Sequence, residues 1–144
     1  MAKASIDIGS NSMVLLVTDD HGHTLHDETA IVGLGKGLGN NAGFRMDRMD
    51  AALSAFEHFK LRCDAFGIDP SSIVSIATSA SRRANNAESF FCEVHAKTGI
   101  AVTIVSGLTE AELTWKGALL GLPIEHSSYA VVDLGGGSTE IVHG

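Results

Sequence analysis

Two short segments of the chain contain the same arrangement of residues that could bind phosphate. In each, an apolar stretch ends in Asp and is followed by an aliphatic residue, glycine, two small residues, serine and a second apolar stretch. Glycine lets the backbone approach an oxyanion closely, and the backbone N–H groups and serine hydroxyl of such a turn can donate to phosphate oxygens. One copy alone would fit an ordinary tight hairpin, but two matched copies predict a pair of facing phosphate-binding loops. Their residues are Gly9, Ser10, Asn11 and Ser12 in the first loop and Gly135, Gly136, Gly137 and Ser138 in the second.

Acidic residues stand beside both loops. Asp7 and Asp133 end the strands that lead into the loops, where a carboxylate can hold a divalent cation directly or through water. Glu140 follows Asp133 by seven residues, so both side chains could reach one ion from opposite limbs of the turn. The alternative for Glu140 is an ordinary surface acid on a strand. We therefore predict Asp133, Glu140 and Asp7 as ligands of a divalent cation.

Two further segments follow predicted strands, which is where open α/β sheets bind their ligands. In residues 78–86, Arg82 could hold phosphate oxygens with its planar guanidinium, although the hydroxyls and amides there could simply cap a helix. In residues 106–113, Thr109 and Glu112 fit a capping box, which leaves Glu110 without a capping role. Glu110 is either a first-turn acid that interacts favourably with the helix dipole, or a general base that orients and deprotonates water.

Strands and helices alternate along the chain and must position these residues. Apolar stretches bounded by turn residues predict strands at 4–8, 13–18, 24–32, 73–77 and 101–105. The predicted helices run over about 47–66, from a cap at Asn85 or Asn86 to Gly99, and over about 108–120. Asp47 is the expected cap of the first helix, and Gly67 its left-handed end. This order predicts an α/β fold in which helices pack on the faces of a mixed five-stranded sheet.

Bulk properties exclude several classes of protein. The chain has 144 residues, of which 44% are hydrophobic and 19% charged, as in a soluble globular domain. A net charge of −7 disfavours a nucleic-acid partner, and no apolar run is long enough for a membrane span. Cys63 and Cys92 fall in predicted helices and are expected to be single core thiols, as is usual in a reducing cytoplasm. Trp115 is also expected in the core.

Four motifs in chain order resemble those of the exopolyphosphatase / guanosine pentaphosphate phosphohydrolase (Ppx/GppA) family, within the actin-like ATPase superfamily. They lie at residues 7–12, 78–86, 106–117 and 133–140. The resemblance implies a ribonuclease-H-like fold in two lobes with an active site between them. It also implies Mg²⁺-dependent hydrolysis of terminal phosphate from inorganic polyphosphate, or of the 5′ phosphate of guanosine pentaphosphate.

The resemblance also implies roles for individual residues. Glu110 would be the catalytic base, Asp133 and Glu140 would organise the metal, and Arg82 would hold phosphates together with the two loops. Residues 1–125 would form the first lobe, and residues 126–144 the opening hairpin of a truncated second lobe, because family chains are much longer. We expect such a fragment to be inactive alone, with its terminal hairpin disordered or docked against the first lobe or a second copy, which leaves a homodimer open.

Two other functions fit the same loops. A phosphate or nucleotide sensor would bind through them without turnover. An actin-like small-molecule kinase would need an acceptor pocket and an adenosine site in its second lobe. The preference between polyphosphate and guanosine pentaphosphate cannot be read from these residues, since both substrates present a terminal phosphoryl group to the same pair of loops.

Overall fold

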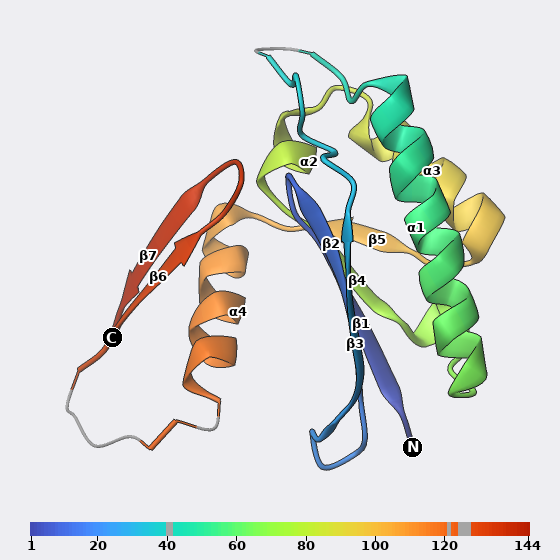
Figure 1. The fold of residues 1–144 in the computed structure, drawn as a ribbon. Helices are drawn as coiled ribbons and strands as arrows, with labels where there is room; N and C mark the ends of the chain where they lie inside the picture. The colour runs from blue at the N-terminus through green and yellow to red at the C-terminus, as the bar shows by residue number, and fades with distance from the viewer. Residues whose placement is uncertain (40–41, 121, 124–127) are drawn as a thin grey trace.

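A five-stranded mixed sheet is the main layer of the protein. The computed structural model describes residues 1–39, 42–120, 122–123 and 128–144. The strands follow the order β3-β2-β1-β4-β5 (Figure 1), with β1 antiparallel to β2 and parallel to β4. They are β1 (Lys3–Ile8), β2 (Ser12–Thr18), β3 (Thr24–Ile31), β4 (Val74–Ala77) and β5 (Val102–Ile104). The predicted α/β fold with a mixed five-stranded sheet is confirmed, and each strand end lies within one residue of its predicted position.

Only one face of this sheet carries the hydrophobic core. Ile6 and Ile8 of β1 are buried, whereas Asp7 between them points to the other face because side chains alternate along a strand. Two helices cover the buried face, α1 (Met46–Ala65) and α3 (Ala87–Thr98) (Figure 1). Together with Ile6 and Ile8, the largest fully buried side chains are Phe56, Phe59, Met13, Leu15 and Leu34. The opposite face is more exposed, and Asp7 lies on it near the end of β1.

The ends of the helices agree in part with the sequence analysis. Gly67 and Gly99 follow α1 and α3 with left-handed φ angles of 69° and 77°, as predicted. The prediction that Asp47 caps α1 is wrong, because the helix already begins at Met46 with Arg45 at the N-cap. Asp47 instead accepts a 3.0 Å hydrogen bond from Arg45 Nε within the first turn.

Two predicted caps differ in mechanism. Asn86 stands at the N-cap of α3, but its side chain accepts from the Phe44 backbone N–H at 2.7 Å instead of capping the helix. The predicted capping box of Thr109 and Glu112 is wrong, since α4 (Gly107–Leu119) begins one residue after Ser106. The Ser106 hydroxyl accepts from the Thr109 backbone N–H at 3.1 Å and is the actual cap.

A short helix and a 3₁₀ turn were not expected from the sequence. The helix α2 (Ser79–Arg83) follows β4 directly, and the 3₁₀ turn η1 (Pro70–Ser72) precedes that strand. Both are too short to show the periodicity that identifies longer helices. Cys63 is buried as expected, but Cys92 is exposed, so the prediction of a second core thiol is wrong. Both cysteines are free.

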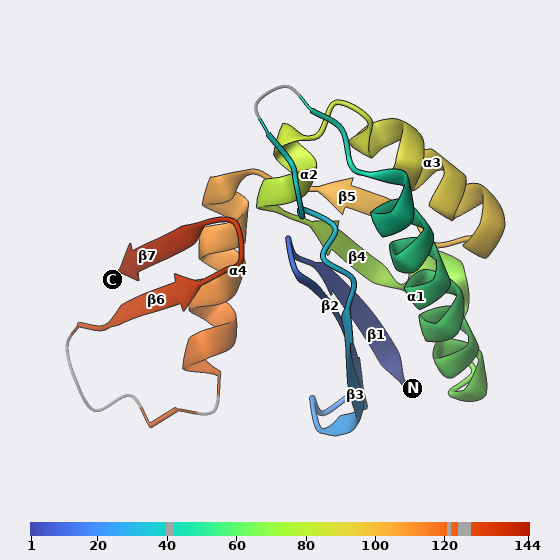
Figure 2. The ribbon, with the colours of Figure 1, turned by 45° about the horizontal axis from the view of Figure 1, so that its top comes forward.

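A separate β-hairpin lies on the side of the main sheet away from α1 and α3 (Figure 2). Its strands, β6 (Ala130–Leu134) and β7 (Thr139–His143), contact α4. No residue of α4 is buried, so Trp115 is only partly covered, near Gly144 at the end of the hairpin, and does not belong to the core as expected. The hairpin is thus docked against the preceding part of the chain. In the part of the chain that the structure describes, no helix combines the length and apolarity needed to cross a membrane.

Candidate active site

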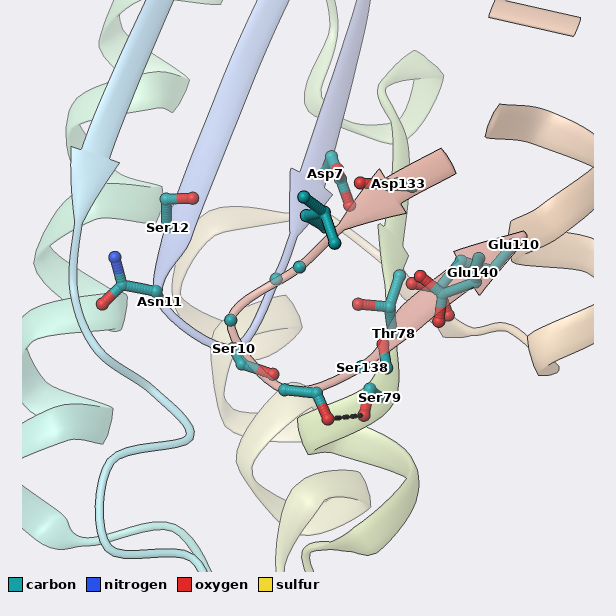
Figure 3. Close-up of a pocket in the computed structure, with 15 residues that line it drawn as sticks. Asp7, Ser10, Asn11, Ser12, Thr78, Ser79, Glu110, Asp133, Ser138 and Glu140 are labelled. Atoms are coloured by element: carbon teal, nitrogen blue, oxygen red, sulfur yellow. Dashed lines mark hydrogen bonds between the residues drawn. The ribbon is translucent and has the colours of Figure 1, made fainter. Parts of the chain in front are cut away.

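One polar cavity lies between the main sheet, α4 and the second hairpin. Its volume is about 490 Å³, and it contains all of the predicted site residues except Arg82. Figure 3 shows side chains from β1, the junction of β4 and α2, α4 and the hairpin pointing into it. The lining residues are Asp7, Gly9, Ser10, Asn11, Ser12, Thr78, Ser79, Glu110, Asp133, Leu134, Gly135, Gly136, Gly137, Ser138 and Glu140.

The two predicted loops have the same backbone hydrogen bond. The Gly9 N–H donates to the Ser12 carbonyl at 2.9 Å, and the Gly135 N–H donates to the Ser138 carbonyl at 3.0 Å. Each bond closes a turn of two residues between antiparallel strands. The sequence repeat therefore corresponds to a structural repeat.

The tips of the two loops touch each other. A Cβ atom on Gly137 would overlap the Ser10 hydroxyl, and one on Gly136 would stand 3.2 Å from Asn11 Cβ. The Ser79 hydroxyl donates to the Gly137 carbonyl at 3.4 Å and links the second loop to α2 (Figure 3). Glycine is therefore required at the tip of the second loop because a side chain there would push the loops apart.

A third segment supports the first loop from behind. The N–H of Gly35 donates to the Ser10 carbonyl at 2.8 Å, and the N–H of Gly33 donates to the Asn11 carbonyl at 2.8 Å. A side chain on Gly35 would come within 3.2 Å of Ala80 Cβ in α2. The glycine content of residues 33–39 was the only sequence signal of this role, which was not predicted.

Four carboxylates line the cavity: Asp7, Glu110, Asp133 and Glu140. Desolvation by the surrounding atoms raises the pKa of Asp7, although part of the residue stays open to solvent, and the charges of Glu110 and Asp133 raise it further. Asp133 and Glu140 are direct cross-strand partners in the hairpin, an unfavourable arrangement of like charges. A cation bound in the cavity would offset this repulsion.

Arg82 lies outside the cavity and contacts one of these carboxylates. Its Nη1 donates to Glu110 Oε2 at 2.7 Å and to the Val105 carbonyl at 2.9 Å. The side chain of Glu110 is only 13% exposed, so the pair is partly shielded from solvent. Both contacts use Nη1, which leaves the other guanidinium donors for a further ligand. The predicted role of Arg82 in phosphate binding stays a prediction.

The acidic residues fit a divalent cation that retains water and substrate oxygens among its ligands. Among the described residues, no three Asp, Glu, His or Cys side chains converge closely enough to hold an ion together. Magnesium is usually bound by one or two carboxylates, with water and phosphate oxygens completing its shell. Asp133 with Glu140, or Asp133 with Asp7, could supply those carboxylates.

Three hydroxyl side chains at the site were not predicted as site residues. Thr78 and Ser79 line the cavity, at the point where β4 passes into α2. Thr114 of α4 donates to Asp133 Oδ2 at 3.3 Å and orients that carboxylate. The position of Thr78 and Ser79 directly after a strand was a sequence signal that they could lie at the site. Thr114 gave no such signal, because it reaches the site only through the packing of α4 on the hairpin.

Comparison with known proteins gives consistent results. The model of the "Ppx/GppA phosphatase family" matches residues 13–144. Over 98% of its length, the chain is 34% identical to exopolyphosphatase 2 of Mycobacterium tuberculosis, of which it covers 47%. Over 99% of its length, it is 30% identical to a bifunctional 3-dehydroquinate synthase/phosphatase of Fusobacterium nucleatum, of which it covers 23%. The chain thus spans at most about half of these curated relatives.

Solved structures are similar over the whole chain. An exopolyphosphatase from Cytophaga hutchinsonii superimposes with a TM-score of 0.92 at 32% identity, and the chain covers 46% of it. The Aquifex aeolicus member of the Ppx/GppA family gives a TM-score of 0.84 at 31% identity, with 47% of that chain covered. The ethanolamine utilization protein EutJ from Carboxydothermus hydrogenoformans, at 20% identity and a TM-score of 0.53, is similar in fold alone.

Proposed function

Because this chain belongs to the Ppx/GppA phosphatase family, we propose that it supplies the phosphate-binding half of a phosphohydrolase active site. The proposed reaction is the Mg²⁺-dependent release of terminal phosphate from inorganic polyphosphate, of the 5′ phosphate from guanosine pentaphosphate, or of both. The names of its relatives in Mycobacterium tuberculosis and Cytophaga hutchinsonii support polyphosphate as the substrate class.

The observation that carries this proposal is the contact between the two matched loops beside a partly buried acid. Ser10 and Gly137 meet at the loop tips, and Glu110 lines the same cavity from α4. Backbone N–H groups and hydroxyls can bind phosphate oxygens at the loops, while the carboxylate stands where water could be activated. An acid placed beside the phosphate-binding loops therefore favours hydrolysis over binding without turnover.

In the proposed reaction, Glu110 accepts a proton from a water molecule as that water attacks the terminal phosphorus. A phosphorus–oxygen bond forms to the water oxygen, and the bond to the bridging oxygen breaks on the opposite side, releasing orthophosphate and a shortened chain. Arg82 holds the Glu110 carboxylate at 2.7 Å and thereby sets its orientation. The loop N–H groups stabilise the charge that develops on the phosphate oxygens.

A magnesium ion held by Asp133 with Glu140 or Asp7 would neutralise phosphate charge and balance the carboxylates of the site. The pKa of Asp7 is raised first by desolvation and then by the charges of Glu110 and Asp133, and this second cause supports a cation at the site. The other ligands would be water and phosphate oxygens.

The remaining features of the proposal concern the intact protein. Residues 126–144 would open a second lobe, and residues 1–144 alone would release little phosphate, since half of the site would lack its support. Two free cysteines support a cytoplasmic location, and a homodimer remains compatible with the exposed surface of the hairpin.

The test is phosphate release by the intact protein that carries these residues. Polyphosphate and guanosine pentaphosphate would each be assayed with and without Mg²⁺. Magnesium-dependent release from at least one of them is expected. Binding without release from either substrate would favour the sensor, and transfer of phosphate to a small acceptor would favour a kinase.

A further inference from the structure

A second arginine stands where the two loops meet. Arg83 is the last residue of α2, and its Nη2 lies 3.4 Å from the position that a Cβ atom on Gly137 would occupy. The Ser10 side chain borders the same position. The Arg83 guanidinium therefore lies beside the tips of both phosphate-binding loops.

The two neighbouring arginines differ in their partners. Arg82 is bound to Glu110 and to the Val105 carbonyl. Arg83 is exposed and makes no hydrogen bond or ion pair with any residue that the structure describes. All of its guanidinium donors are thus available to an anion, and an arginine binds phosphate oxygens with two parallel hydrogen bonds.

The geometry of the reaction directs substrate toward Arg83. Figure 3 shows Glu110 and Ser10 on opposite sides of the cavity. An adjoining cavity of about 220 Å³ also contains Glu110, Asp7 and Asp133 but does not reach the loop tips. In an in-line displacement, the leaving oxygen departs on the side away from the attacking water. If Glu110 activates the water, the rest of the phosphate chain must extend toward the loop tips.

Charge favours the same direction. The end of the cavity near α4 holds the carboxylates. A phosphate chain that extended from the terminal phosphate toward that end would be repelled by them. At the loop tips, the backbone donors of the loops and the Arg83 guanidinium are the attractive groups.

We propose that Arg83 binds the phosphoryl groups that follow the terminal one, and so favours long phosphate chains over short ones. This inference rests on the proposed function. Arg83 would act mainly on the binding of the substrate and not on the chemical step, because it neighbours the loop tips, whereas Glu110 is held by Arg82.

The experiment compares Arg83→Gln, Arg83→Lys and the wild type in the intact protein. Arg62→Gln is the matched control, since Arg62 is an exposed arginine of α1 outside the cavity. KM and kcat would be measured for long-chain polyphosphate and for tripolyphosphate, and the dissociation constant of tripolyphosphate would be measured by calorimetry without Mg²⁺. Loss of a charge-assisted hydrogen bond predicts a KM for long chains about tenfold higher in Arg83→Gln, with kcat nearly unchanged.

Two further results are expected if Arg83 binds phosphate through its charge. Arg83→Lys should retain most of the affinity, and the KM of the wild type should rise more steeply with salt than that of Arg83→Gln. An unchanged KM in Arg83→Gln, or an equal loss for Arg62→Gln, would overturn the inference while leaving the function intact. If no substrate is hydrolysed, the function fails, and the calorimetric comparison still decides whether Arg83 binds phosphate.

Discussion

Arg82 Nη1 lies 2.7 Å from Glu110 Oε2, and the same nitrogen lies 2.9 Å from the Val105 carbonyl oxygen. The two residues are 28 positions apart and belong to different helices, α2 and α4. One guanidinium thus fixes a carboxylate at the wall of the cavity and ties it to the end of β5. This relationship suggests a division of roles between a base and the residue that positions it.

Replacement of Glu110 tests the base. Glu110→Gln preserves shape but cannot accept the proton, so kcat for phosphate release should fall by roughly 10²–10⁴-fold with a smaller change in KM. Glu112→Gln is the control, because Glu112 is an exposed acid on the same helix and does not line the cavity. Comparable kcat in the wild type and Glu110→Gln would remove Glu110 from the mechanism.

Replacement of Arg82 tests the positioning role. Arg82→Gln should lower kcat by about 10- to 100-fold, because a misplaced catalytic group loses much of its effect. Arg82→Lys should recover part of kcat if a positive charge at Glu110 suffices, and little of it if the planar geometry is needed. The control is Arg45→Gln, which removes an exposed ion pair with Asp47. A higher KM with unchanged kcat would instead assign Arg82 to phosphate binding alone.

The contact between the loops can be tested at two glycines. Gly137→Ala should strongly reduce activity, because its Cβ would overlap the Ser10 side chain and force the loops apart. Gly117→Ala is the matched control, since a Cβ there meets no atom within 4 Å on α4. That control should keep its activity and gain about 0.5–1 kcal/mol of unfolding free energy from helix propensity. Full activity in Gly137→Ala would show that the loops need not stay together.

Asp7 should make the protein less stable at neutral pH. Its pKa is raised in the folded state by desolvation and by nearby charges, so the folded protein binds the proton more tightly than the unfolded chain does. The Asp7 contribution to unfolding free energy therefore falls as pH rises through its normal and raised pKa values. Asp7→Asn should then be more stable than the wild type at pH 7, and the difference should shrink in acid.

Urea denaturation at both pH values would measure this effect, with Asp50→Asn as the control on the exposed face of α1. Equal stabilisation by Asp7→Asn in acid and at neutrality would mean that its charge is not responsible.

Metal binding should be visible without turnover. A ligand that binds only the folded state raises the unfolding temperature, so Mg²⁺ with orthophosphate should stabilise the wild type in a thermal melt. Asp133→Asn and Glu140→Gln should lose most of this shift, whereas Asp50→Asn should keep it. If both site variants respond to Mg²⁺ as the wild type does, the ion is held elsewhere.

Much of the fold could be predicted because the signals were local. The alternation of apolar residues in β1 and β2, and the glycines that end α1 and α3, depend on neighbouring residues in the sequence. The predicted caps were less reliable. Ser106, and not Thr109, caps α4, and the Asn86 side chain bonds to the backbone of Phe44, 42 residues away, instead of to its own helix.

The sequence by itself determined the two loops, because each turn is closed by a hydrogen bond between residues three apart, Gly9 to Ser12 and Gly135 to Ser138. It also placed an acid beside each of them. Only the tertiary structure decided that the loop tips touch, that Glu110 is held by Arg82, and that Arg83 lies at the loop junction without a partner among the described residues. The loop contact and the positions of the two arginines depend on how α2, α4 and the hairpin pack around the end of the sheet. No short-range sequence pattern encodes that packing.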